Sequence, residues 1–220
     1  MWVLKNLSVG YGSKALITGI NLSFDIGDRF CIVGDNGSGK STLYRTIAGH
    51  IPPLNGVMSN DLAASCSIVS DSVRPPSDCT VAELCGLLGE IGDSRIKTRA
   101  PGIFNFIKNN ADCRVSHLSL GQRRLLEIGI CLAAGRSILI LDEAFSGLDY
   151  RSRELCLGVV NSLSDITVFN TSHNLEDIVD LNGLIVYIDP IEKKLFKYRG
   201  ARDVRSLRRF MVRRAEMVAS

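Results

Sequence analysis

The sequence predicts an α/β fold in which helices cover a mostly parallel β-sheet. Three observations support this fold class. Short apolar segments with strand-like spacing alternate along the chain with longer segments of helical spacing. One apolar segment, "RFCIVG" at residues 29–34, runs into a glycine-rich loop and then into a helical segment. Another, "SILILDE" at residues 137–143, ends in two adjacent acids. Strands that alternate with helices in this way are typical of parallel sheets.

The front of the chain is expected to be antiparallel. Residues 2–12 predict a strand that ends in a glycine turn, and residues 15–28 predict two more short strands with alternating apolar residues. Because strands joined by short turns pair antiparallel, we expect an antiparallel patch ahead of the parallel sheet. The buried strand at 29–34 then leads through the glycine loop to a helix over 40–50, which the segment "IPPLNG" ends.

The rest of the chain alternates between helical and strand-like segments. We expect a strand at 65–70, a loop with two prolines (75 and 76), a helix-prone segment over 80–109, a strand at 137–143, a helix over 151–163, a strand at 166–172, a short helix near 175 and a strand pair within 183–198. This order predicts one domain over 1–200, with a core at 1–71 and 130–200 and a small α-helical subdomain at 72–129. A basic C-terminal helix follows at 201–220.

Composition favours a globular chain that is soluble by itself. The 220 residues are 45% apolar, which is ample for a sizeable core. No apolar run reaches about 18 residues, and the first ten residues do not have the pattern of a secretory signal. The seven cysteines are odd in number and never spaced CxxC, which indicates reduced thiols in a cytoplasm rather than disulfides or a zinc site.

The net charge of +3 is unevenly distributed. Residues 192–220 hold ten Lys and Arg against three acids, so the positive charge belongs to the tail. The sequence therefore predicts no nucleic-acid partner. Within the tail, apolar residues at 204, 207, 210, 211 and 218 recur near helical spacing, with arginines on the remaining face. We interpret this as a helix packed on the core. The alternative is a basic face directed at anionic headgroups or at an acidic partner surface.

The glycine loop at 34–41 predicts a phosphate site. It matches GxxxxGK[ST] in full and lies between a strand and a helix, as this motif requires. Backbone N–H groups of such a loop converge on phosphates, the Lys40 ammonium can reach the β and γ oxygens, and the Ser41 hydroxyl can ligate Mg²⁺. The expected nucleotide-binding residues here are Gly34, Asp35, Asn36, Gly37, Ser38, Gly39, Lys40, Ser41 and Thr42.

The acids after the strand at 138–141 are the expected complement of this loop. Ligands of open α/β sheets bind at the carboxyl ends of the strands, where Asp142 and Glu143 lie. We expect Asp142 to hold Mg²⁺ and Glu143 to polarise the water that attacks the γ-phosphate. The alternative is that the two acids only begin a solvated loop.

Five motifs in order resemble those of the ABC ATPases and cover roughly residues 1–190. "LSLGQ" at 118–122, here called the signature turn, resembles the family signature LSGGQ. The other four are an aromatic residue before the glycine loop, the loop itself, the acids followed by "SGLD" at 146–149, and a histidine after a later strand. The resemblance implies a P-loop NTPase fold of ABC type with ATP and Mg²⁺ as its nucleotide and metal.

In this family two such domains pack head to tail, and the signature turn of one seats the γ-phosphate held by the glycine loop of the other. The resemblance therefore implies that Ser119, Gly121 and Gln122 bind a nucleotide on a second ATPase subunit, an identical copy in the simplest case. The physical reasoning is independent: the turn opens a helix, whose free N–H groups and positive dipole end attract an anion.

Further site residues are implied only by the resemblance. Tyr11 matches the aromatic residue that stacks on adenine, although by itself it reads as a turn residue. His173 matches the histidine that contacts the γ-phosphate, while no such role is expected for His50 or His117. Asp149 matches the acid whose loop crosses the dimer interface.

The sequence also departs from the family pattern. Asp71 stands where a Gln usually contacts Mg²⁺ and water, and a carboxylate there could bind the metal directly. Leu120, Ile130, Ala144 and Phe145 also differ from the common residues, but none of these changes removes a catalytic atom.

The resemblance implies an ATP-binding and ATP-hydrolysing subunit of an ABC transporter, which dimerises on ATP and drives separate transmembrane permease subunits. It would lie at the cytoplasmic face of the inner (plasma) membrane, held there by those subunits. The loop at 71–76 and the helical segment would be its docking surface. Two alternatives remain: a partner-regulated ATP switch with little intrinsic hydrolysis, and a soluble ABC ATPase that serves no transporter.

Overall fold

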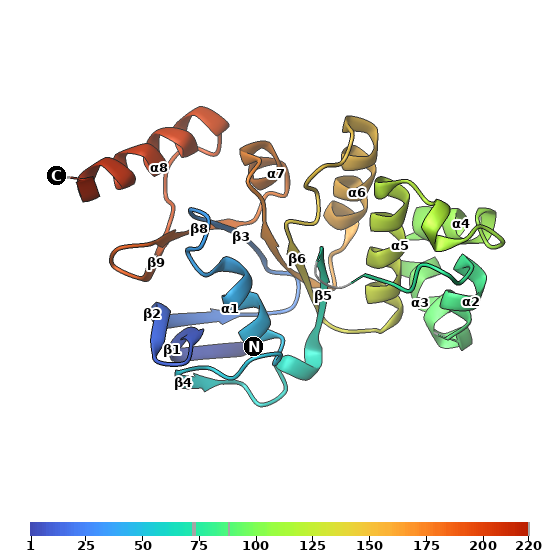
Figure 1. Cartoon of the computed structure of the whole chain (residues 1–220), viewed down its shortest axis with the longest axis horizontal. Coiled ribbons are helices and arrows are strands. Elements are labelled where there is room, and N and C mark those ends of the chain that lie inside the picture. The colour runs from blue at the N-terminus through green and yellow to red at the C-terminus, as the bar shows by residue number, and fades with distance from the viewer. Residues whose placement is uncertain (72–73, 88, 220) are drawn as a thin grey trace.

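Two β-sheets form the centre of this computed structural model, which describes residues 1–71, 74–87 and 89–219 (Figure 1). Of residues 90, 91, 93 and 215–219 it describes the backbone alone. The smaller sheet is antiparallel, with the order β2–β1–β4, and consists of β1 (Trp2–Tyr11), β2 (Lys14–Phe24) and β4 (Asn55–Met58). It is the antiparallel patch that the sequence predicts.

The larger sheet has the order β5–β6–β7–β3–β8–β9. Its first five strands in this order are parallel, and β9 pairs antiparallel with β8. The strands are β3 (Arg29–Val33), β5 (Cys66–Ser70), β6 (Ile138–Asp142), β7 (Thr167–Thr171), β8 (Leu184–Asp189) and β9 (Lys194–Lys197). Every residue of β6 and β7 is buried, as expected for central strands of a parallel sheet covered by helices.

The helices pack against the sheets and extend beyond them at the end opposite the antiparallel sheet (Figure 1). α1 (Lys40–Ile47) contacts both β1 and β6, and so lies between the two sheets. α5 (Leu120–Ala133) packs on β5 and α6 (Tyr150–Ser162). α2 (Val81–Gly86), α3 (Gly89–Arg99) and α4 (Pro101–Asn109) form the end opposite the antiparallel sheet (Figure 1). α7 (Leu175–Asp180) contacts α8 (Val204–Ala219), the helix predicted from the tail.

Three details differ from the sequence-based expectations. Residues 15–28 predict two strands, but β2 runs unbroken to Phe24 and residues 25–28 form a turn. Gly19 takes a left-handed φ of 63°, which lets the strand continue through an irregular register with β1. β4 was not predicted, since prolines and Gly56 obscure its short pattern. The helix-prone segment at 80–109 is three helices, with Gly89 at φ 65° where α3 begins and Pro101 at the first position of α4.

α5 runs through residue 129, where we placed the end of the helical subdomain. The helix contacts α3 and α4 on one side and β5 and α6 on the other, so it belongs to both predicted parts. Motion of the subdomain would therefore also move α5, whose first turn holds the signature residues.

Aromatic rings anchor the strands that lead to the site. Phe30 of β3 stacks on Phe169 of β7 with ring centroids 4.8 Å apart, and Phe24 of β2 meets both rings edge-on. Tyr44 of α1 adds a fourth ring against Phe169. All four side chains are buried. Such aromatic pairs contribute about 0.5–1.5 kcal/mol each beyond their buried area, which fixes the register of β3 and β7.

Candidate nucleotide-binding site

The predicted site residues gather at one edge of the large sheet. Because β5, β6, β7 and β3 are parallel neighbours, their carboxyl ends lie side by side. Asp71 follows β5, Glu143 follows β6, His173 follows β7 and the glycine loop follows β3. Segments separated by more than a hundred residues in sequence thus meet, and His173 lies between the loop and Glu143 in strand order. This is the edge at which open α/β sheets bind ligands.

The glycine loop has the backbone that its glycines predict. Gly37 and Gly39 have φ of 79° and 103°, which side-chain-bearing residues rarely adopt. A Cβ at Gly39 would lie 3.1 Å from Leu16 and 3.2 Å from Ile17, so the loop also packs closely on β2. Gly39 caps α1, and the unpaired N–H groups of the first helical turn therefore face the loop.

Lys40 is folded back onto its own loop. Its ammonium donates to the carbonyl oxygens of Gly34 at 2.8 Å and Asp35 at 3.0 Å, and the residue is only 5% exposed. Burial lowers the pKa of Lys40, and the carboxylates of Glu143 and Asp142 partly oppose that effect. A buried cation held by neutral carbonyls is well placed to exchange these partners for phosphate oxygens, which carry charge.

One polar atom in the loop lacks a protein partner. Ser38 Oγ is buried and makes no hydrogen bond to the part of the chain that the structure describes. Orphaned buried hydroxyls are uncommon, because each costs about 1–3 kcal/mol. A phosphate bound in the loop would supply the missing acceptor, so the residues present fit a nucleotide.

A cavity of about 280 Å³ lies beside the loop. Its lining joins the loop to two predicted residues from elsewhere in the sequence, Tyr11 and Glu143, and to Leu16, which was not predicted. The full lining is Tyr11, Leu16, Asn36, Gly37, Gly39, Lys40, Ser41, Thr42 and Glu143. The Tyr11 ring is 52% exposed, and a hydrogen bond with Thr42 lowers the pKa of Tyr11. An exposed aromatic face at the mouth of a phosphate cradle suits a stacked base.

Asp142 and Ser41 are the candidate magnesium ligands. The Asp142 carboxylate accepts from Thr171 Oγ1 at 2.9 Å, which fixes its orientation at the sheet edge. Among the described residues no cluster of three or more His, Cys, Asp or Glu could hold a metal by itself. The Asp142 carboxylate and the Ser41 hydroxyl beside the glycine loop fit Mg²⁺, which proteins typically hold through one or two carboxylates together with substrate phosphates and water. The residues present therefore fit the metal.

Glu143 and His173 form a pair. His173 Nε2 lies 2.7 Å from Glu143 Oε1, and both side chains are partly exposed. Glu143 has a φ of 55°, an unfavourable value for a residue with a side chain, and its N–H is held by Thr171 O and Oγ1. Strained backbone of this kind is concentrated at functional sites. The arrangement directs the carboxylate away from the strand and towards the glycine-loop cavity, which it lines.

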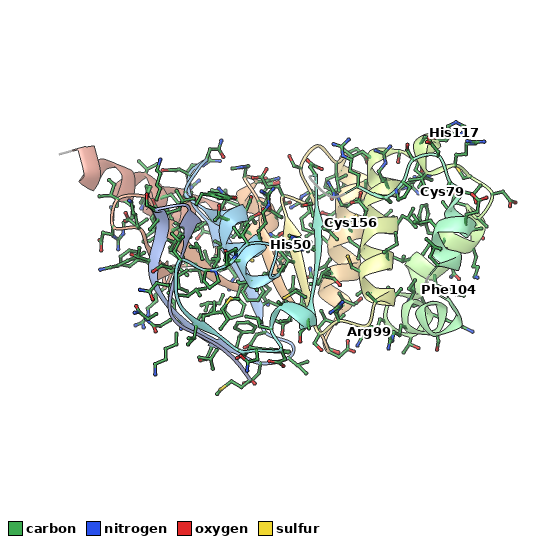
Figure 2. The ribbon with its side chains drawn as sticks, turned by 60° about the horizontal axis from the view of Figure 1, so that its bottom comes forward. His50, Cys79, Arg99, Phe104, His117 and Cys156 are labelled. Atoms are coloured by element: carbon green, nitrogen blue, oxygen red, sulfur yellow. The ribbon has the colours of Figure 1, made fainter. Side chains whose placement is uncertain are left out.

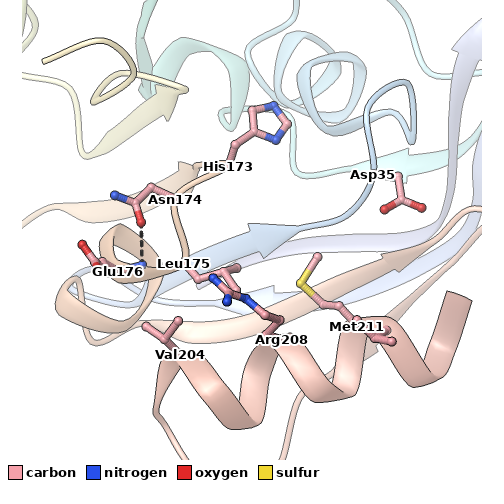
Figure 3. Close-up of a pocket in the computed structure, with 9 residues that line it drawn as sticks. Asp35, His173, Asn174, Leu175, Glu176, Val204, Arg208 and Met211 are labelled. Carbon is pink, nitrogen blue, oxygen red and sulfur yellow. Dashed lines mark hydrogen bonds between the residues drawn. The ribbon is translucent and has the colours of Figure 1, made fainter.

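His173 also borders a second cleft, of about 430 Å³, between the end of β7 and α8. Figure 3 shows His173 extending away from α7, and Asn174 accepting from the Glu176 N–H at 2.9 Å. Asp35 lies across the cleft, and Arg208 and Met211 of α8 line its floor. His50 and His117 lie elsewhere, on the turn after α1 and at the outer part of the helical end (Figure 2).

The signature turn opens α5 as a reciprocal cap. Ser119 Oγ accepts from the Gln122 N–H at 3.2 Å, and the Gln122 side chain accepts from the Ser119 N–H at 2.9 Å. The N–H groups of Leu120 and Gly121, at the first two helical positions, lack intrahelical partners. Ser119 and Gln122 thus use part of their hydrogen-bonding capacity within the turn. The N–H groups of Leu120 and Gly121, which lack intrahelical partners, form the end of the helix that can bind an anion.

Neither the signature turn nor Asp149 reaches the glycine-loop cavity of its own chain. None of the described residues at 118–122 or 146–149 lines it. The two segments instead contact each other: a Cβ at Gly147 would lie 3.3 Å from Leu120. Asp149 caps α6, accepting from the Ser152 N–H at 3.0 Å and from Ser152 Oγ at 2.7 Å.

Asp71 is engaged elsewhere than at the magnesium ligands. Its carboxylate forms an ion pair with Arg124 of α5 at 2.7 Å, and Arg124 also pairs with Glu127 at 2.6 Å. Arg124 is only 2% exposed, and burial raises the pKa of Glu127. Oδ1 of Asp71 is occupied, so Oδ2 is the oxygen that a cation could use. The predicted docking loop at 71–76 includes residues 72–73, which lie outside the described part of the chain.

Sequence reasoning missed residues that support the site without touching a ligand. Thr171 holds both Asp142 and Glu143, and Leu16 lines the nucleotide cavity. Neither Thr171 nor Leu16 belongs to a sequence motif. Arg124 could have been suspected, because a charged residue on the apolar face of a predicted helix needs a buried partner.

Comparisons with known proteins show which proteins this chain resembles. A family model described as ABC transporter matches residues 17–146. The zinc import ATP-binding protein ZnuC of Wolbachia sp. subsp. Brugia malayi is 28% identical over 199 residues, covering 84% of this chain and 78% of its own. An uncharacterised ABC transporter ATP-binding protein of Methanocaldococcus jannaschii is 32% identical over 201 residues, covering 78% and 67%. Nod factor export ATP-binding protein I of Rhizobium meliloti is 29% identical, covering 79% and 57%.

Solved structures share the fold. The ATP-binding subunit of an ABC transporter superposes with a TM-score of 0.79 at 20% identity, covering 98% of this chain and 99% of that one. A bacterial Atm1-family ABC exporter with ATP bound gives a TM-score of 0.77 at 24% identity, covering 100% of this chain and 42% of the exporter chain. Within the described residues, no helix combines the length and apolar character needed to cross a membrane.

Proposed function

Because the chain belongs to the ABC transporter family, as an ATP-binding subunit with ATPase activity, we propose that it works as a head-to-tail pair. Each copy binds ATP at its glycine loop and presents its signature turn to the ATP of the other. The pair drives separate membrane subunits at the cytoplasmic face of the inner (plasma) membrane. The relatives include an importer subunit and an exporter subunit, so the proposal concerns the motor that they share.

One observation carries the pairing. The signature turn lies at the amino end of α5 with two N–H groups lacking intrahelical partners, yet the turn lines no part of the described cavity around Lys40. The signature turn can bind an anion but lies away from the nucleotide cavity of its own chain. A second molecule that brings its own nucleotide to this turn explains the arrangement. Each charge-assisted hydrogen bond to phosphate contributes about 1.5–3 kcal/mol, so a few at each of two sites suffice to hold a dimer that ADP does not hold.

Within each site the residues divide the work. Backbone N–H groups of the glycine loop and the Lys40 ammonium bind the β- and γ-phosphates, and the Tyr11 ring stacks on adenine. Ser41 and Asp142 hold Mg²⁺, which neutralises charge on the phosphate oxygens when bound. The remaining phosphate contacts come from Ser119, Gly121 and Gln122 of the other copy.

Glu143 and His173 act at the γ-phosphate. Glu143 orients and polarises the attacking water, and a position 2.7 Å from His173 lets the two side chains share that task. His173 contacts the γ-phosphate once nucleotide is present. Asp149, on the loop that touches the signature turn, links the two sites across the interface.

A cavity of about 230 Å³ supports the docking of membrane subunits beside the β5 edge. It joins the strand that ends near Asp71 to α2 and α5, and most of its lining is apolar: Ile68, Val69, Arg74, Pro75, Pro76, Leu84, Glu127, Ile130 and Cys131. An apolar groove with a few charges suits a partner segment. Because Arg124 ties Asp71 to α5, a partner bound here would also act on the signature turn.

The trapped dimer tests the proposal. Glu143→Gln removes the catalytic carboxylate but keeps its size, so ATP should bind without being hydrolysed. We expect this variant to elute as a dimer in size-exclusion chromatography with ATP and Mg²⁺, and as a monomer with ADP. Glu154→Gln, at an exposed acid on α6, is the matched control and should not trap the dimer. A monomer under conditions in which bound ATP is measured would contradict the pairing.

A partner-regulated ATP switch is the second candidate, favoured by the ion pair of Asp71 with Arg124. If partner docking must release Asp71 before hydrolysis, the chain alone binds ATP and turns it over only slowly. Turnover of the purified chain, measured without and with its membrane subunits, separates the two functions. A rate that the membrane subunits leave unchanged would contradict the switch.

A further inference from the structure

A buried carboxylate that no motif predicts lies beside the candidate site. Asp177 lies in α7 and is only 2% exposed. Its Oδ1 accepts from Arg153 Nε at 2.5 Å, and its Oδ2 accepts from Ser172 Oγ at 2.5 Å. A buried charge needs such partners, because an unpaired one is strongly destabilising. Both oxygens of Asp177 thus have hydrogen-bond partners, Oδ1 with Arg153 and Oδ2 with Ser172.

Ser172 connects Asp177 to His173, the next residue in the chain. Ser172 Oγ donates to Asp177 and accepts from the Asn174 N–H at 3.0 Å. Asn174 is itself held, since its side chain caps α7 at Glu176. The residues before and after His173 are therefore fixed by one hydrogen-bonded turn. The imidazole extends away from α7 (Figure 3) and its Nε2 pairs with Glu143 Oε1.

Arg153 connects Asp177 to the "SGLD" loop at 146–149. Arg153 lies one turn into α6, and its N–H donates to the Asp149 carbonyl oxygen at 2.9 Å. Its guanidinium reaches Asp177, Asp180 and Glu154. Displacement of the loop at Asp149 would carry the start of α6, and Arg153 with it, relative to α7.

We infer that Asp177 is a positioning residue for His173, and that with Arg153 and Ser172 it couples the loop at Asp149 to the histidine. The inference rests on the proposed role of His173 and adds to it a physical connection within one chain. Arrival of a second molecule at Asp149 would then be transmitted through a buried ion pair and a serine hydroxyl to the catalytic pair. Misplacement of a catalytic group by about 1 Å can cost roughly 100-fold in rate, so a modest shift is enough.

A double-mutant cycle on the full chain tests this. Asp177→Asn keeps the shape and removes the charge, and we expect it to lower the single-turnover rate of ATP hydrolysis by roughly 10- to 100-fold with ATP affinity unchanged. In a His173→Ala background the same substitution should add less than about 2-fold, because the residue acts through the histidine. An equal loss in both backgrounds would indicate a structural role and overturn the inference.

Two matched variants separate the network from general stability. Asp180→Asn removes a different carboxylate partner of Arg153, which is half exposed, whereas the hydrogen bonds of Ser172 go to Asp177 and Asn174. This variant should cost less than about 3-fold. Ser172→Ala removes only the hydroxyl and should behave like Asp177→Asn, which keeps the test decisive if Asp177→Asn folds poorly. Full activity of Ser172→Ala would overturn the inference.

A readout without turnover completes the experiment. The chain has three histidines, so the His173 ring signal can be assigned by its loss in His173→Ala. We expect Asp177→Asn and Ser172→Ala to shift this signal in the nucleotide-free protein, and Asp180→Asn to leave it in place. A full rate for His173→Ala would refute the proposed role of the histidine, whereas an impaired His173→Ala beside a fully active Asp177→Asn would refute the present inference alone.

Discussion

Gly121 of the signature turn packs directly against Ser152 of α6. A Cβ at Gly121 would lie 2.1 Å from Ser152 Oγ and 2.3 Å from Ser152 Cβ, closer than any real contact. Since Ser152 is also held by Asp149, the two glycine-containing segments expected to contact a second molecule form one unit. A side chain at Gly121 must separate them.

We therefore predict that Gly121→Ala prevents ATP-dependent dimerisation while the monomer still binds ATP. The overlap should also cost about 1–3 kcal/mol of stability. Size-exclusion chromatography in the Glu143→Gln background measures the first effect and urea unfolding the second.

Ser152→Gly should relieve the overlap and restore the dimer in the double variant. Gly158→Ala, in the same helix with open space around it, is the control and should leave the dimer intact. Dimerisation of Gly121→Ala equal to that of the parent would contradict the expected geometry.

Lys40 supports a second prediction. Its ammonium has only neutral carbonyl partners in the loop, at Gly34 and Asp35, and phosphate would replace them with charged oxygens. Lys40→Ala should weaken ATP binding by roughly 10- to 100-fold, as expected for the loss of one or two charge-assisted bonds. Calorimetric titration with a non-hydrolysable ATP analogue measures this, and Lys5→Ala on an exposed strand position is the control. Equal affinity would place the phosphates elsewhere.

The gathering of the candidate site residues at one sheet edge was largely predictable, because each motif is local in sequence. Residues 29–47 carry their strand, loop and helix signals together, and Asp142 ends the wholly buried strand β6. The parallel order of β6, β7 and β3 then brings Glu143 and His173 together. Residues that act through contacts distant in sequence could not be predicted. Nothing local distinguishes Asp177 from other helix acids, and the role that we infer for it depends on a partner 24 residues away.

The errors in the fold have similar physical reasons. Gly19 reads as a turn, but a left-handed glycine can also continue an irregular strand. β4 has four residues and depends on pairing with β1, so its stability is tertiary. Gly89 and Pro101 interrupt the helix-prone segment at points that spacing alone did not reveal.

The candidate magnesium ligands give a third prediction. Asp142 is buried at the sheet edge with its orientation set by Thr171, whereas Asp71 is 59% exposed with one oxygen on Arg124. Asp142→Asn should therefore raise the Mg²⁺ concentration needed for half-maximal hydrolysis more than Asp71→Asn does. Titration of the ATPase rate with Mg²⁺ at saturating ATP measures both. The reverse order would make Asp71 the principal ligand.

The same ion pair predicts unequal effects on stability. Arg124→Met leaves the buried Glu127 unpaired, and breaking a buried pair in this way costs about 3–5 kcal/mol. Asp71→Asn changes an exposed partner and should cost at most about 1 kcal/mol. Urea unfolding of the two variants compares them, and similar losses would indicate that Asp71 and Glu127 share the arginine equally.

The buried thiols predict a loss of stability in alkali. Burial raises the pKa of Cys31 to about 11 and of Cys156 to about 12, while the same thiols ionise near 8.5 once unfolded. Between these values the unfolded chain binds fewer protons than the native one, so the free energy of unfolding falls as pH rises. Each such thiol should remove about 2 kcal/mol between pH 8 and 10. Unfolding by urea at both pH values, with reductant present, measures this fall in the free energy of unfolding.

Cys156→Ala loses packing at either pH, but its free energy of unfolding should fall less between the two pH values, by about the 2 kcal/mol that one thiol contributes. Cys79→Ala, at a half-buried position, is the control, and an unchanged drop in Cys156→Ala would show that this thiol does not drive the alkaline loss.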